Sequence, residues 1–394
     1  MSATAEARFP EQPLPPWRRA VLKVGSSLLT EAGALSARHA RPLAAFIAAS
    51  RAAGRDVVLV SSGAVAAGRA QLCTSTQNAR ADLVLRQALA ALGQTRMVAL
   101  WQEQLALAAG AGAQFPVAQV LLSHDDLRNR RRYLNARNTL LELLRLGALP
   151  VVNENDTVAV EELKLGDNDN LAAIVAALVD ADLLLIASDI DGLYSAHPQR
   201  DPHAQPVPLV AALTPAVFAM AGAAGSAHGT GGMRTKLEAA QKASSAGIDT
   251  VLFHGGEPAG VAKLAGGTFH GTRIAAAGSR LAARKYWLRH APGARAAIRV
   301  DAGAARALRA GKSLLPGGIV AVDGEFARGD LVEIVSAQAP DAAFARGLTQ
   351  YNAHEVRRVA GRQSGEIEAI LGFRYGDTVV HRDDLVAFDA DVTA

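Results

Sequence analysis

The sequence predicts an α/β fold, a three-layer sandwich with a largely parallel central sheet, followed by a small C-terminal β-barrel. Two observations support this prediction. Up to about Gly271, short runs rich in Val, Leu and Ile alternate with longer Ala/Leu segments of helical spacing. Such continuous apolar runs are typical of strands buried on both faces of a parallel sheet. From about Ala296 onward, the apolar runs are shorter and the glycine turns closer, which is typical of a small barrel.

In the first domain, helical segments separate the expected strands, which are Ala20–Val24, Asp56–Val60, Val117–Leu122, Leu149–Val152, Asp182–Ala187 and Thr250–Phe253. In the barrel, turn signals such as Asp323-Gly324 separate the expected strands, which are Ala297–Val300, Ile319–Val322, Leu331–Val335, Phe344–Gln350 and Val379–His381. Short helices are expected near Ala302–Ala310 and Ala353–Val359.

These elements indicate two domains with a connector. We expect the first domain over residues 20–271, a connector over 272–295 that is poor in strand signals, and the barrel over 296–384. Residues 1–19 contain four prolines and no apolar run, so they are expected to form a mobile tail, and residues 385–394 are expected to form a C-terminal tail.

Composition excludes several classes of protein. The 41 basic and 37 acidic residues give a net charge of only +4, which argues against extensive coating of nucleic acid. The single cysteine, Cys73, cannot form an internal disulfide. The longest apolar run, Leu171–Val179, is much shorter than the roughly 18 residues of a membrane helix. With no secretory signal, we expect a cytoplasmic protein without membrane contact.

Lysine is rare in this chain, and two lysines occur where a cation is costly. Lys23 lies in an expected buried strand, followed by Gly25, Ser26 and Ser27, whose small side chains suit a close ligand. Lys236 lies on the first turn of an expected helix, where it opposes the helix dipole unless an anion is near. The simpler interpretation of Lys23 is an edge-strand lysine that reaches solvent.

A glycine-rich loop opens that helix and is suited to phosphate binding by backbone N–H groups. Its sequence is Gly229-Thr230-Gly231-Gly232-Met233-Arg234-Thr235-Lys236. A flexible loop is the alternative. Ser188 and Asp189 end the most apolar strand, where Asp189 is a candidate nucleotide contact. Gly311-Lys312-Ser313 is excluded as a P-loop because residue 306 is Arg and Pro316 follows closely.

Polar clusters follow two further strands. Ser61-Ser62-Gly63-Ala64 comes directly after one of them, and Asn153-Glu154-Asn155-Asp156 after another, with Gly166-Asp167-Asn168-Asp169-Asn170 ten residues later. Their amides and carboxylates suit an amino group, a carboxylate or a hydrated metal, although such residues also form ordinary turns and helix caps. Two lysines, a glycine-rich loop and no redox or nucleophile signature together indicate phosphoryl transfer.

Five of these motifs, which begin at Lys23, Ser61, Asn153, Gly166 and Gly229, follow one another along the chain in this order. Together they closely resemble the amino-acid kinase superfamily, and the resemblance extends from about Ala20 to Asp384. Within it, the resemblance is to members that phosphorylate the γ-carboxylate of L-glutamate with MgATP, the first step of proline biosynthesis. It implies that Ser62, Asp156 and Asn168 hold glutamate. It also implies that Lys23 and Lys236 flank the transferred phosphoryl group and that Asp169 orients them.

By the same resemblance, the two lysines also contact ATP, together with Gly25, Ser26, Ser188, Asp189, Thr230, Gly231, Gly232, Met233, Arg234 and Thr235. Mg²⁺ is expected to arrive with ATP, and no residue is assigned as a metal ligand. A homo-oligomer and a partnership with the downstream glutamyl phosphate reductase are further expectations.

The C-terminal domain resembles a PUA domain, a small barrel often found in RNA-modifying enzymes. The segment that carries this resemblance is Gly324-Glu325-Phe326-Ala327-Arg328-Gly329-Asp330. Arg357, Arg358 and Arg362 are a candidate basic face for RNA. Because arginine is the default cation of this chain, a solvated face is the favoured interpretation. The alternatives to the kinase reading are a kinase of another amino-acid carboxylate and an RNA-binding protein that uses the barrel.

Overall fold

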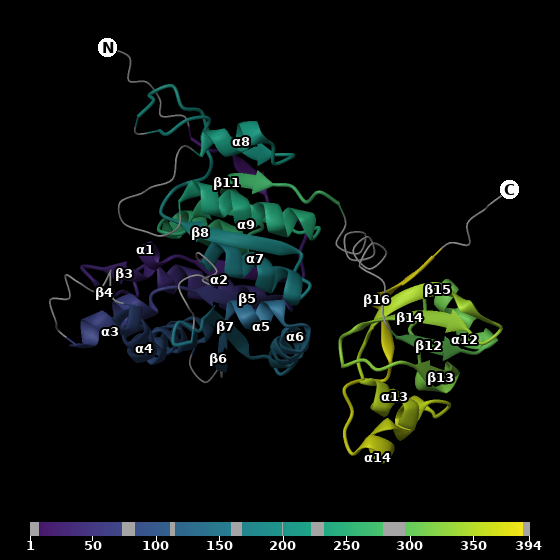
Figure 1. Cartoon of the computed structure of the whole chain (residues 1–394). Helices are drawn as coiled ribbons and strands as arrows, with labels where there is room; N and C mark the ends of the chain where they lie inside the picture. The colour runs from purple at the N-terminus through teal and green to yellow at the C-terminus, as the bar shows by residue number, and fades with distance from the viewer. Residues whose placement is uncertain are drawn as a thin grey trace, which may run out of the picture. The chain divides into compact units, whose positions relative to one another are not determined.

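The computed structural model describes residues 8–72, 83–110, 115–158, 168–198, 200–221, 232–278 and 296–388. The elements fall into two compact units, each built on its own sheet (Figure 1). The two units are described separately below.

The sheet of the first unit has the strand order β1-β11-β10-β8-β2-β5-β7-β6, with β9 paired to β11. From β6 to β10 all neighbours are parallel, and β11 and β1 extend that edge in antiparallel pairs. The largely parallel sheet is therefore confirmed, and each expected strand of this domain is present. The strands are β1 (Glu11–Pro13), β2 (Arg19–Val24), β5 (Asp56–Ser61), β6 (Val117–Leu122), β7 (Leu149–Glu154), β8 (Leu183–Ser188), β9 (Leu209–Val210), β10 (Asp249–His254) and β11 (Thr268–Ile274).

Helices cover both faces of this sheet (Figure 1). On one face, α2 (Ala40–Ala52), α4 (Leu83–Ala109) and α10 (Pro258–Ala265) contribute to a single core with the strands. On the other face lie α7 (Asn168–Leu178) and α9 (Met233–Ser245), which pack on each other and on the central strands. The remaining elements are α1 (Ser26–Leu29), α3 (Ala64–Leu72), α5 (His124–Arg128), α6 (Arg130–Arg145), α8 (Pro215–Met220) and the hairpin β3 (Thr30–Glu31) and β4 (Ala34–Leu35).

Side chains alternate across the sheet with a period of two, and this alternation decides what each face presents. In β2, Leu22 and Val24 belong to the core under α2 and α4. Lys23, between them, therefore points to the opposite face, toward α7 and α9. By the same rule, Ser61 and Asn153 lie on the α4 face of their strands. Each comes two residues after a member of that core, Leu59 in β5 and Val151 in β7.

The second unit is a five-stranded sheet of order β13-β12-β14-β15-β16 around its own core. A strand-rich C-terminal domain is thus confirmed. Its elements are β12 (Ala297–Val300), α12 (Ala302–Arg309), the 3₁₀ turn Pro316–Gly318, β13 (Ile319–Asp323), β14 (Leu331–Ser336), β15 (Ala339–Thr349), α13 (Ala353–Val359), the 3₁₀ turn Ser364–Glu366, α14 (Ile367–Leu371) and β16 (Val380–Ala387). Both helices expected from the sequence begin at side-chain caps, Asp301 and Asn352.

Three expected boundaries differ from the structure, the first two near the ends of the first domain. A mobile tail over residues 1–19 does not hold for Glu11–Pro13, which pairs with His270 to Thr268 as β1. The pairing is by backbone groups, so it leaves no apolar pattern in the sequence, and Lys263 Nζ adds an ion pair with Glu11 at 2.6 Å. The connector was expected from residue 272, but β11 continues to Ile274, which pairs with Thr250 of β10, and the buried Thr272 donates its hydroxyl to Val207 O at 2.7 Å.

The C-terminal boundary also differs, since the expected end of the domain at residue 384 falls inside β16. Asp384 is 8% exposed, and Leu385 and Val386 are buried. Charged residues early in this strand conceal its apolar end in the sequence. Residues 1–7, 279–295 and 389–394 of the expected tails and connector lie outside the described residues.

Helices α3 and α4 approach each other backbone to backbone at two glycines. A Cβ atom at Gly93 would lie 1.7 Å from Ala64 O, and one at Gly68 would lie 1.9 Å from Leu89 O. No side chain fits at either position, so this crossing requires glycine on both helices.

We expect Gly93→Ala to lower the free energy of unfolding of the first unit by about 3 kcal/mol, because the methyl group forces the helices apart. The matched control is Gly260→Ala in α10, where the nearest atom to a new Cβ is Glu257 Oε2 at 3.5 Å. That change should be neutral or stabilising by up to about 1 kcal/mol. Denaturant unfolding measures both, and a Gly93→Ala protein as stable as wild type would contradict the packing described.

Candidate active site

The candidate site lies at the carboxyl ends of the parallel strands, near the centre of the sheet. The chain leaves β2 toward β5 on one side and later returns, through α7, to β8 on the other side of β2. Where the strand order reverses in this way, the connecting segments diverge and leave a crevice outside the strand ends. The ends of β2, β5, β7 and β8 and the first turns of α7 and α9 contribute the side chains described below.

A buried cluster of three charges forms the centre of the site. Asp169 Oδ1 lies 2.5 Å from Lys23 Nζ, and its Oδ2 lies 3.2 Å from Lys236 Nζ. Asp169 is fully buried, and the two lysines are 5% and 6% exposed. The carboxylate therefore neutralises one of two cations, which leaves the cluster with one net positive charge at neutral pH.

Helix termini position two members of this cluster. Asp169 lies in the first turn of α7, where the helix dipole favours an anion. Lys236 lies in the first turn of α9, where the dipole opposes a cation, and the sequence indicated an anion beside it. In the structure that anion is Asp169. Thr235 also donates its hydroxyl toward Asp169 Oδ2 at 3.3 Å and to Gly232 O at 2.8 Å.

Opposing effects act on the ionisation of Asp169. Burial alone would raise the pKa of its carboxyl group, but the charges of Lys23 and Lys236 and their hydrogen bonds outweigh burial and lower the pKa below its usual value. The carboxylate is therefore ionised at neutral pH.

A second cluster, of amides and hydroxyls, adjoins the charges. Asn168, the residue before Asp169, donates from Nδ2 to Ser62 Oγ at 2.8 Å and to Asn153 Oδ1 at 2.9 Å, with Ser61 O at 3.4 Å. The structure thus brings together two of the residues expected to hold glutamate, Ser62 and Asn168. The third, Asp156, is half-buried in the turn that follows β7.

Helix α4 supports this second cluster with two side chains that sequence reasoning missed. Trp101 Nε1 donates to Ser61 Oγ at 2.8 Å, and Gln94 Oε1 accepts from Asn153 Nδ2 at 3.3 Å. Both side chains lie on the buried face of α4. The alternation in β5 and β7 is the available signal, because it places Ser61 and Asn153 on the α4 face, where each requires a polar partner.

Of the residues expected to bind nucleotide, those in the described part of the chain lie at the start of α1, at the end of β8 and at the start of α9. Gly25 caps α1, and a Cβ there would lie 3.6 Å from Lys23 Nζ, so a larger side chain would crowd the ammonium group. Ser26 is exposed, as is Asp189, while Ser188 at the end of β8 is buried and donates to Asp189 at 3.2 Å. Gly232 and Met233 begin α9, and Arg234 pairs with Glu238 of the same helix at 3.1 Å. Thr230 and Gly231 lie outside the described residues, as do Gly229, Gly166, Asp167 and Cys73.

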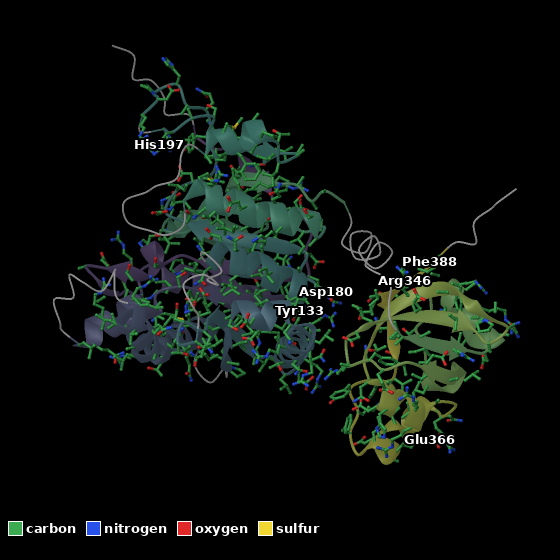
Figure 2. The ribbon with its side chains drawn as sticks, viewed as in Figure 1. Tyr133, Asp180, His197, Arg346, Glu366 and Phe388 are labelled. Carbon is green, nitrogen blue, oxygen red and sulfur yellow. The ribbon has the colours of Figure 1, made fainter. Side chains whose placement is uncertain are left out.

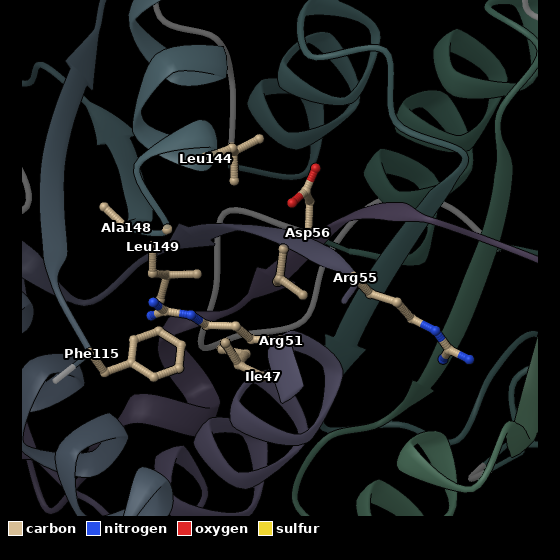
Figure 3. Close-up of a pocket in the computed structure, with 10 residues that line it drawn as sticks. Ile47, Arg51, Arg55, Asp56, Phe115, Leu144, Ala148 and Leu149 are labelled. Atoms are coloured by element: carbon tan, nitrogen blue, oxygen red, sulfur yellow. The ribbon is translucent and has the colours of Figure 1, made fainter. Parts of the chain in front are cut away.

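A separate small pocket lies at the other end of the strands (Figure 3). It is lined by Asp56 and Leu149, which begin β5 and β7, and by Arg51, whose guanidinium lies 4.5 Å from the centre of the Phe115 ring. Since ligands of such sheets bind at the carboxyl ends of the strands, this pocket is not the candidate site.

The candidate basic face of the second unit is partly engaged within the unit. Arg357 pairs with Glu325 at 2.6 Å, and Arg358 donates to Ile370 O. Arg346 is similarly engaged, with Glu333 at 3.0 Å and over the Phe388 ring, beside which Figure 2 shows it. These contacts accord with the solvated-face interpretation, and RNA binding stays an untested prediction.

The described part of the chain has neither a metal-binding cluster nor a membrane-spanning helix. No group of three or more His, Cys, Asp or Glu side chains there is arranged to hold a metal ion. No helix there combines the length and apolar composition that crossing a membrane requires.

Comparison with known proteins agrees with this architecture. The amino acid kinase family profile matches residues 18–254, and the PUA domain profile matches residues 296–371. The chain is 60% identical to glutamate 5-kinase of Xylella fastidiosa (strain M12) over 384 residues, which cover 96% of this chain and 98% of that protein. It is 62% identical to glutamate 5-kinase of Xanthomonas euvesicatoria pv. vesicatoria (strain 85-10) over 369 residues, 93% of this chain and 99% of that protein.

We expect Asp169→Asn to lower the free energy of unfolding by about 3 kcal/mol at pH 7, because two buried ammonium groups lose their counter-ion. Since the pKa of Asp169 is lowered on folding, its stabilising contribution is complete above the usual value of 3.8 and is lost as the pH falls below that value. The stability gap between wild type and variant should therefore be constant from pH 7 to 5 and narrow below about pH 3.8. Denaturant unfolding at several pH values measures it, and a gap that widens in acid would contradict this account.

Proposed function

The chain belongs to the amino acid kinase family, and from this premise we propose that it is a glutamate 5-kinase. The γ-carboxylate of L-glutamate attacks the γ-phosphorus of ATP, the bond from that phosphorus to the β-phosphate oxygen breaks, and L-glutamyl 5-phosphate and ADP form. Its near full-length relatives carry this name, at 60% and 62% identity. The reaction is the first step of proline biosynthesis.

One observation supports this proposal above the others. Asn168 and Asp169 are adjacent on the first turn of α7, yet one side chain contacts Ser62 and the other contacts the two lysines. An acceptor bound at the amide cluster therefore lies beside the cationic cluster that suits a phosphoryl group. Because a carboxylate is already deprotonated, the reaction requires no general base, only positioning and charge stabilisation.

In this proposal Lys23 and Lys236 contact the oxygens of the transferred phosphoryl group, where negative charge spreads in the transition state. Asp169, which contacts both ammonium groups, holds them close together and oriented toward the phosphoryl group. Ser62, Asp156 and Asn168 hold glutamate. Gly25, Ser26, Ser188, Asp189 and the start of α9 hold ATP.

The charged side chains of the site, Lys23, Lys236 and Asp169, fit phosphate groups better than a metal ion bound by the protein alone. The cluster carries one net positive charge, and no group of acidic or histidine side chains in the described part would hold Mg²⁺ by itself. We therefore propose that Mg²⁺ enters bound to the phosphates of ATP and neutralises part of their charge. A homo-oligomer, a partnership with glutamyl phosphate reductase and a cytoplasmic location complete the proposal.

The direct test combines purified protein, MgATP, L-glutamate and hydroxylamine, which traps an acyl phosphate as the hydroxamate. We expect γ-glutamyl hydroxamate that depends on both glutamate and ATP. Aspartate and N-acetylglutamate, offered separately, test the alternative of another carboxylate acceptor. Absence of hydroxamate with glutamate, from folded protein, would overturn the proposal.

We expect Lys236→Ala to lower kcat by about 10²- to 10³-fold, because the cation it removes stabilises charge in the transition state. Lys242→Ala is the matched control: it is on the same helix, and its ammonium donates to Asn170 at 2.8 Å rather than into the charge cluster. That variant should keep kcat within a few-fold of wild type. Equal kcat values for wild type and Lys236→Ala would rule out the assigned role.

We expect Asn168→Ala to raise the KM for glutamate by about tenfold to a hundredfold, the loss typical of a hydrogen bond to a charged group. The KM for ATP should change little, because Asn168 faces the amide cluster. Steady-state kinetics with each substrate varied in turn measures both constants. A change confined to the KM for ATP would contradict the proposal that Asn168 binds glutamate.

A further inference from the structure

A relay of three side-chain amides runs from helix α4 to the acceptor side of the site. Gln94 Oε1 accepts from Asn153 Nδ2 at 3.3 Å, and Asn153 Oδ1 accepts from Asn168 Nδ2 at 2.9 Å. Asn168 Nδ2 also donates to Ser62 Oγ at 2.8 Å. Gln94 is 5% exposed on the helix face that also carries Leu89, Met97 and Trp101, and both of its amide atoms have partners, in Asn153 and Glu154.

Backbone groups determine the direction of the relay. Glu154 N–H donates to Asn153 Oδ1 at 2.9 Å, and Glu154 O accepts from Gln94 Nε2 at 3.4 Å. At the other end, Ser61 O lies 3.4 Å from Asn168 Nδ2. A backbone N–H only donates and a carbonyl oxygen only accepts, so only this order of amide oxygens and nitrogens satisfies all three contacts.

This direction decides which atom of Asn168 is left for a ligand. Its Nδ2 is used by Ser62, Asn153 and Ser61, whereas its Oδ1 accepts no hydrogen bond from any residue in the described part of the chain. An amide oxygen recognises a donor such as an ammonium group and repels a carboxylate. The relay thus sets the polarity with which the site meets its acceptor.

We propose that Gln94 is a positioning residue that fixes this polarity through Asn153 and so presents Asn168 Oδ1 to the α-ammonium group of the acceptor amino acid. The inference rests on the proposed function. Gln94 does not touch the acceptor, and its own hydrogen bonds are long, so its loss should weaken acceptor binding moderately and leave the phosphoryl site intact.

The test is Gln94→Met, which keeps the length of the side chain and removes its amide. We expect the KM for glutamate to rise about fivefold to tenfold, the equivalent of one lost hydrogen bond, with kcat and the KM for ATP within twofold of wild type. Gln104→Met is the matched control, because Gln104 is equally buried on α4 and its Oε1 accepts no hydrogen bond among the described residues. The control should keep wild-type kinetics.

A double-mutant cycle distinguishes positioning from a general loss of packing. If Gln94 acts through Asn168, Gln94→Met should cause no further rise in the KM for glutamate in the Asn168→Ala background. An additive effect in that background would overturn the inference, as would a wild-type KM in Gln94→Met alone. Should Gln94→Met fail to fold, Gln94→Ala is measured in the same way.

The experiments distinguish failure of the proposed function from failure of the role proposed for Gln94. Wild-type protein without glutamate-dependent turnover contradicts the proposed function and this inference with it. Wild-type turnover with unaltered kinetics in the Gln94 variants contradicts the inference alone.

Discussion

The buried contact of Asp169 with Lys23 and Lys236 is the constraint on which the other features of the site depend. It joins the central strand β2 to the first turns of α7 and α9, three segments far apart in the chain. Burying three charges is costly, and replacing them by apolar side chains would stabilise many proteins. The arrangement is instead suited to holding two cations close together until a more highly charged anion arrives between them. The same carboxylate thus neutralises part of the buried positive charge and, in the proposed function, orients both lysines for phosphate.

Much of this could be predicted from the sequence, for physical reasons that differ by element. The parallel strands were recognisable because all of them except the edge strand β6 are largely buried on both faces, and the polar residues that end them marked one edge of the sheet. Strand β1 was not recognisable because it is three residues long, has no apolar run and is joined to β11 by backbone pairing with a few polar side-chain contacts. Gln94 was missed because an isolated glutamine in an Ala/Leu helix is typical of an exposed position. Its partner Asn153 is 59 residues away, and only the fold brings them together.

Packing of α3 on α4 connects the scaffold to the acceptor side of the site. Helix α3 begins two residues after Ser62, and Gly93 of α4 packs against the backbone of its first residue, Ala64. Gln94 is the next residue in α4. A glycine contact without side chains is therefore what places Ser62 and Gln94 on either side of the same amide cluster. In the proposed function, specificity for the acceptor would depend on this helix packing as well as on the residues that meet the substrate.

The pairing of β1 with β11 has a consequence for how the chain folds during synthesis. Glu11 is synthesised 259 residues before its partner His270. At roughly 5 to 20 residues per second, the first strand waits about 13 to 52 s for its neighbour. The edge of the sheet is thus completed last, as a long-range contact of high entropic cost. The pairing of β1 with β11 is therefore expected as a late step in the folding of the first unit.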